Sequence, residues 1–119
     1  MKLLAALLIP AAAWAGNADK GKAIATGGSE ASCILCHAIP DAPRPAGNLG
    51  PSLAGVAKRL GAAELKARLV DPSRVNPRTA MPAYGKVDGL HQVALQYRGK
   101  PLLTDEQIDD VVAFLLTLK

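Results

Sequence analysis

The chain has 119 residues and a formal net charge of +4, and only 3% of its residues are aromatic. This length predicts a single domain. No run of lysines and arginines with interleaved aromatics is present, so the composition argues against a nucleic-acid-binding protein. A domain this small buries a limited apolar surface, and a large apolar cofactor would therefore add much to its stability.

The first segment predicts an export signal. It has a charged start, an apolar run over residues 3–13 and an A-x-A cleavage pattern that ends at Ala15. The run is shorter than the roughly 20 residues of a membrane span, and Pro10 interrupts it. We expect a signal peptide over residues 1–15 and a periplasmic mature domain over 16–119. An uncleaved membrane anchor is the alternative.

Residues 17–26 predict a short helix, capped by Asn17 or Asp19 and ended by Gly27-Gly28. Gly21 lies inside this helix and lowers its helix propensity. Either another helix crosses closely at Gly21, or the glycine is merely tolerated there.

The segment Cys33-Ile34-Leu35-Cys36-His37 has the pattern C-x-x-C-H, the attachment signal for a c-type haem. Two thiols three positions apart on one turn can each add across a haem vinyl group, which gives two thioether bonds. His37 follows directly and can supply the axial nitrogen that haem iron needs. The pattern predicts one covalent haem c on Cys33 and Cys36, with His37 as an iron ligand.

Three other interpretations of this pattern are weaker. A thioredoxin-like redox pair needs a βαβ setting and a lowered thiol pKa, and no βαβ pattern is visible. A structural zinc site needs four ligands, whereas the chain has two cysteines and two badly spaced histidines. A plain disulfide between Cys33 and Cys36 would leave His37 unexplained.

After His37, prolines and glycines predict a loop that wraps one edge of the haem. The ring N–H of His37 needs an acceptor that fixes the orientation of the imidazole. We expect the backbone carbonyl of Pro51 to be that acceptor, and Leu53 to lie against the haem ring.

Residues 62–70 predict a second helix, ended by Asp71-Pro72. A second extended loop follows and carries Met81, whose thioether is the candidate for the sixth iron ligand. A core-filling methionine is the alternative role of Met81. His91 is a second, weaker candidate for the same ligand position.

The segment 85–103 is longer than a connection between two helices requires, which is often a sign of function. Apolar and polar residues alternate over 93–98 and predict a short strand, followed by a turn at Gly99-Lys100-Pro101.

Thr104 and Gln107 form a capping box, and apolar residues recur with helical spacing from Ile108 to Leu116. This pattern predicts a final amphipathic helix. Its acidic residues, and the basic residues in the middle of the chain, suggest two solvated faces; the alternative is a bipolar surface that orients a partner.

Together these features resemble the class I c-type cytochromes. The stretches CILCHAIP (33–40), NLGPSLAGV (48–56), VDPSRVNPRTAMP (70–82) and DGLHQVALQYRGKPLLT (88–104) are similar to the SoxX family, the monohaem subunits of SoxAX complexes in sulfur-oxidising bacteria. The resemblance implies an all-α fold: a single class I cytochrome c domain with short helices wrapped around the haem.

The resemblance also implies a function. SoxX would transfer single electrons within a heterodimer with SoxA, which joins thiosulfate to a cysteine of the carrier SoxYZ, and would pass them to a small soluble acceptor. Cys33, Cys36, His37 and Met81 match the family's haem residues. With no third cysteine and no obvious acid–base pair, the chain fits the electron-transfer subunit of this L-cysteine S-thiosulfotransferase rather than the catalytic one. A free cytochrome serving a terminal oxidase and a gas or redox sensor are the alternatives.

Overall fold

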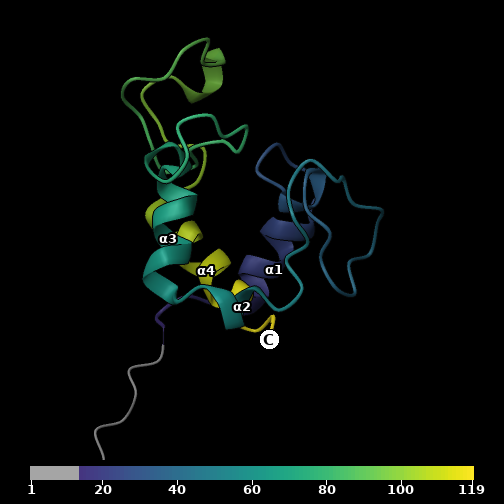
Figure 1. Ribbon diagram of the computed structural model, residues 1–119. Helices are drawn as coiled ribbons and strands as arrows, with labels where there is room; N and C mark the ends of the chain where they lie inside the picture. Colours follow the sequence, from purple (N-terminus) through teal and green to yellow (C-terminus); the bar gives the residue numbers. More distant parts are fainter. Residues whose placement is uncertain (1–13) are drawn as a thin grey trace, which may run out of the picture.

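The computed structural model describes residues 14–119, so most of the predicted signal peptide lies outside the described residues. Its α-helices are α1 (Ala18–Thr26), α2 (Val56–Arg59), α3 (Ala62–Val70) and α4 (Asp105–Leu115), and three single 3₁₀ turns are η1 (Cys33–Leu35), η2 (Pro72–Arg74) and η3 (Leu95–Tyr97). Long loops join these short helices (Figure 1). No strand occurs in the described part of the chain, and the all-α prediction is confirmed.

Helix α4 is the centre of the core. Its capping box forms as predicted: the Gln107 backbone N–H donates to the Thr104 hydroxyl at 3.2 Å, and the Thr104 N–H donates to the Gln107 side chain at 2.9 Å. The largest fully buried side chains of the described residues, Ile108, Val111 and Val112, all belong to this helix.

Helix α1 crosses α4 at Gly21. A Cβ added to Gly21 would lie 1.9 Å from the backbone oxygen of Asp110, so the two backbones touch. This contact settles the choice left open by the sequence in favour of a close crossing. Asn17 begins α1: its side chain accepts from the Lys20 N–H at 3.0 Å, and its own N–H donates to the Asp110 carboxylate at 2.7 Å.

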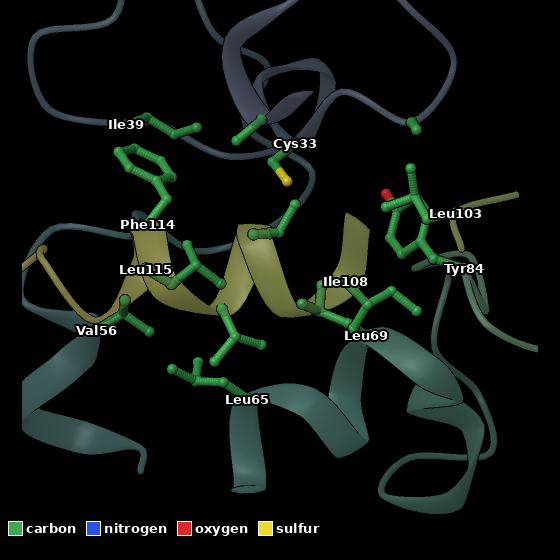
Figure 2. Packing of buried hydrophobic residues seen from close by; sticks show 14 of the residues in the cluster. Cys33, Ile39, Val56, Leu65, Leu69, Tyr84, Leu103, Ile108, Phe114 and Leu115 are labelled. Atoms are coloured by element: carbon green, nitrogen blue, oxygen red, sulfur yellow. The ribbon is translucent and has the colours of Figure 1, made fainter. Parts of the chain in front are cut away.

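Helix α3 packs on the opposite side of α4 through Leu65 and Leu69, which lie close to α4 in Figure 2. Lys66 of α3 forms ion pairs with Asp105 at 3.1 Å and Asp109 at 2.8 Å. The indole N–H of Trp14 donates to the backbone oxygen of Asp109 at 3.0 Å, which attaches the start of the described chain to α4.

The strand predicted over 93–98 is wrong. Within residues 14–119 no other strand is available to pair with it, so the backbone closes on itself: the Tyr97 N–H donates to the Ala94 carbonyl at 2.9 Å and forms η3. No described helix is long and apolar enough to cross a membrane.

Candidate functional site

Two cavities of about 270 and 310 Å³ lie beside η1. Both are lined by Cys33, His37, Pro51, Met81 and Tyr84, so they are the two halves of one crevice. Cys36 lines the second half and Leu53 the first. The structure therefore brings all six site residues predicted from the sequence to the walls of a single space.

The turn η1 places the two cysteines and the histidine on one wall of the crevice. The N–H groups of Cys36 and His37 both donate to the Cys33 carbonyl, at 3.1 and 2.9 Å, and this tight turn holds the three side chains together. Burial raises the pKa of the Cys33 thiol to about 11. A thiol with such a pKa is a poor redox nucleophile at neutral pH, which argues against the thioredoxin-like interpretation.

The His37 ring is held by the loop that follows it. Its Nδ1 lies 2.6 Å from the backbone oxygen of Pro51, the contact expected from the sequence. Because a carbonyl oxygen only accepts, Nδ1 carries the proton and Nε2 keeps the lone pair that can bind a metal. The Gly50 N–H donates to the Cys36 carbonyl at 2.8 Å and keeps this loop against η1.

Gly50 lies directly against the His37 imidazole. A Cβ added there would be 2.4 Å from Cε1 of His37. The close approach of loop and ring therefore requires a residue without a side chain at this position.

Arg59, at the end of α2, also holds the loop that contains Pro51. Its guanidinium donates to the backbone oxygens of Ala54 at 2.8 Å and Ser52 at 3.2 Å, on the residues that follow Pro51. No local sequence pattern indicates this role, because Arg59 is one of the basic residues in the middle of the chain, for which the sequence predicts a solvated face.

Met81 lies in the loop after η2 and lines both halves of the crevice. Its backbone N–H donates to the Thr79 hydroxyl at 3.1 Å. Two hydrogen bonds to the end of α3 hold the residues that follow: the Tyr84 N–H donates to the Leu69 carbonyl at 3.0 Å, and the Gly85 N–H donates to the Val70 carbonyl at 3.2 Å. His91 lines a different groove and none of the crevice, so its position does not favour a role as axial ligand.

The first half of the crevice is largely apolar, and its polar side chains are those of His37, Tyr84 and two arginines. Val56, Leu65, Leu69 and Leu115 form its walls, with Arg59 and Arg68 among them. The buried Nε of Arg68 has no hydrogen-bond partner among the described residues. Burial also raises the pKa of Tyr84 to about 12, which keeps its hydroxyl neutral.

These residues fit a haem. The apolar walls suit a flat hydrophobic ring, and the Arg68 guanidinium offers a buried donor to a propionate. Within residues 14–119, no group of three His, Cys, Asp or Glu side chains could hold a metal ion by itself, so the zinc alternative gains no support.

Comparisons with known proteins agree with this description. The cytochrome c family model matches residues 18–119. No curated protein matches the sequence. Among solved structures, a chain in the crystal structure of SoxXA from P. pantotrophus is 37% identical with a TM-score of 0.77, and the match covers 87% of this chain and 82% of that chain.

Proposed function

Because this chain belongs to the cytochrome c family and, within it, to the SoxX group, we propose that it transfers single electrons through one haem c held by Cys33, Cys36, His37 and Met81. The observation that carries the proposal is that these four side chains line one crevice. The bound haem supplies a one-electron redox centre.

Each residue of the crevice has a distinct role in this proposal. Cys33 and Cys36 form the two thioether bonds. His37 binds through Nε2 while its Nδ1–H donates to the Pro51 carbonyl, which holds the imidazole in one orientation. Met81 would hold the iron through its thioether, and Leu53 would pack on the haem ring. Arg68 donates to a propionate and balances its charge.

His/Met ligation suits electron transfer. A thioether ligand raises the haem potential, which favours withdrawal of electrons from a thiol–thiosulfate couple. If His37 and Met81 both held the iron, no position would be left for a substrate. The bond-forming chemistry then belongs to another subunit.

We further propose that this subunit is SoxA, that the two chains form a heterodimer acting on thiosulfate and the SoxYZ carrier, and that electrons leave to a small soluble acceptor. The similarity to a chain of SoxXA supports the SoxA partnership. Recovery of SoxA together with this chain from the native host would test it. A chain that never binds SoxA would contradict the partnership without affecting the haem assignment.

The family places the protein outside the cytoplasm, and we propose the periplasm, after cleavage behind Ala15. Such cleavage removes Trp14 and with it the hydrogen bond to Asp109, so this contact would belong to the precursor alone. The mass of the mature holoprotein tests the cleavage site. A chain that retains Trp14 would refute it, and its mass would distinguish processing behind Ala13 from an uncleaved anchor.

Met81→Ala tests the ligand assignment. We expect the variant to lose the ferric Met–iron charge-transfer band and to have a lower potential, because iron loses its sulfur ligand. His91→Ala is the control, since His91 lies outside the crevice, and should keep the band. If the band survives in Met81→Ala, Met81 is not the ligand. Binding of carbon monoxide by the reduced wild-type protein would instead support a gas sensor.

A further inference from the structure

The loop of residues 85–102 is separate from the helical core. It projects beyond α3 and α4 as the green segment at the top of Figure 1. Its two ends lie together, because the Leu103 N–H donates to the Tyr84 carbonyl at 2.9 Å. Compact surface loops with closed ends are frequently functional.

Three apolar side chains of the loop are exposed to solvent. Leu95 is 77% exposed, Val87 40% and Leu90 38%. The loop also borders a groove of about 350 Å³, lined among others by Leu90, Val93 and Leu102. Of the three exposed side chains only Leu90 lines the groove, but all three belong to the same loop. Exposed apolar side chains gathered on one loop mark a contact surface more often than isolated ones do.

The charges beside the groove are mainly basic. Lys86 and Lys100 line it, and the exposed Arg98 lies next to Lys100 in the chain, whereas Asp88 is the one acidic residue of the loop. The Nζ of Lys86 also forms an ion pair with the Asp71 carboxylate at 3.5 Å. A complementary partner would present an apolar centre surrounded by carboxylates.

The groove adjoins the haem crevice. Pro82, which follows Met81, lines both spaces. On the other side the Tyr97 hydroxyl donates to the Glu30 carboxylate at 3.3 Å, which ties the loop to the segment leading into Cys33. A protein seated on this loop would therefore lie beside both the Met81 and the Cys33 walls of the crevice.

We propose that the 85–102 loop is the surface on which the SoxA-type partner docks, with an apolar side chain in the groove and carboxylates facing Arg98 and Lys100. The inference rests on the function proposed above. An exposed leucine contributes nothing to the core of its own chain. Contact with a partner would give Leu95 a role at this exposed position.

The test uses the holoprotein co-expressed with its SoxA-type partner, and measures the dissociation constant and the complex on gel filtration. Leu95→Asp should weaken binding by about tenfold or more, because it replaces the most exposed apolar side chain of the loop, which lies outside the groove lining, with a carboxylate on the proposed contact surface. Val75→Asp is the matched control: Val75 is 51% exposed and lines neither groove nor crevice, so binding should stay within about twofold.

Charge reversal provides a second measurement. Arg98→Glu with Lys100→Glu should weaken binding and reduce its salt dependence, whereas Glu106→Lys on α4 should leave both nearly unchanged. The haem spectrum and the potential of each isolated variant should equal those of the wild type, which separates lost docking from lost folding.

Each outcome has a distinct meaning. If Leu95→Asp and the charge reversal bind as the wild type does, the loop is not the docking surface, although the partnership stands. If wild-type protein binds no SoxA-type chain at all, the proposed function fails as well. If the chain alone forms dimers that Leu95→Asp dissociates while partner binding persists, the loop is instead a contact between two copies of this chain.

Discussion

Gly50→Ala would test how the protein holds its histidine. The added Cβ would lie 2.4 Å from Cε1 of His37, 2.7 Å from Nδ1 and 2.8 Å from Nε2. Ordinary van der Waals contact begins at 3.4 Å, so the ring or the loop must move by about 1 Å in a close-packed site. A shift of this size would stretch the 2.6 Å contact between Nδ1 and the Pro51 carbonyl to the limit of a hydrogen bond.

The free-energy cost has two parts. Loss of the hydrogen bond costs about 0.5–1.5 kcal/mol, and overpacking costs about 1–3 kcal/mol. We therefore expect the free energy of unfolding of the holoprotein to fall by about 2–4 kcal/mol, and its Tm by about 8 °C or more. The midpoint potential should rise, because an imidazole that no longer donates to Pro51 is a weaker ligand to ferric iron.

Thermal unfolding and potentiometric titration of the holoprotein measure both effects. Gly61→Ser is the control, since its Cβ would meet only a Glu64 carboxylate oxygen at 3.8 Å and serine is favoured at the N-cap position before α3 that Gly61 occupies. If Gly50→Ala keeps the wild-type Tm and potential, the loop does not constrain His37 and the reasoning is refuted.

Three further changes test other parts of the structure. Gly21→Ala should destabilise the protein by about 1–3 kcal/mol in urea unfolding, since its Cβ would meet the Asp110 oxygen at 1.9 Å; unchanged stability would argue against the close crossing. The Ser73 hydroxyl, aided by Lys86, lowers the pKa of Asp71 below 3.8. The ionised Asp71 carboxylate therefore stabilises the folded protein above that pH, and this stabilisation is lost as pH falls through the lower pKa of the folded state. Wild-type stability should therefore decline more steeply than that of Asp71→Asn as pH falls below about 4, and parallel declines would exclude this role. Arg68→Met should lower the potential and make it more pH-dependent near neutrality, because a propionate loses its cation; a potential unchanged at all pH values would place Arg68 away from the propionates.

The parts of the fold that were predictable are those set by local chemistry. The helix over Ala62–Val70 has the bounds expected from its leucine spacing and from Asp71-Pro72, and the capping box begins α4 after Thr104 as expected. The contact between His37 and Pro51 also follows from local chemistry: a ring N–H needs an acceptor, and the loop that follows the histidine is the nearest source of one.

The parts that were missed depend on contacts distant in sequence. Helix α2 is a single turn, too short to form by propensity, and is held where the Ala57 N–H donates to the Leu118 carbonyl at 3.0 Å. No pattern around residue 57 encodes that partner. The position of Arg68 could not be predicted either. Its Nε is buried because the residue lines the crevice, and the sequence of α3 carries no sign of that crevice.

The strand predicted within the 85–102 loop was wrong for a physical reason. The alternation over 93–98 is the pattern of a half-buried strand, yet a strand is stable only beside another strand, and the described residues offer none. The apolar positions of the alternation therefore have no sheet to pack on, and Leu95 remains in water. Val93 and Tyr97 are half-buried within their own chain, whereas Leu95 is exposed. Burial of Leu95 against a second chain would explain its position, and the Leu95→Asp measurement tests that explanation directly.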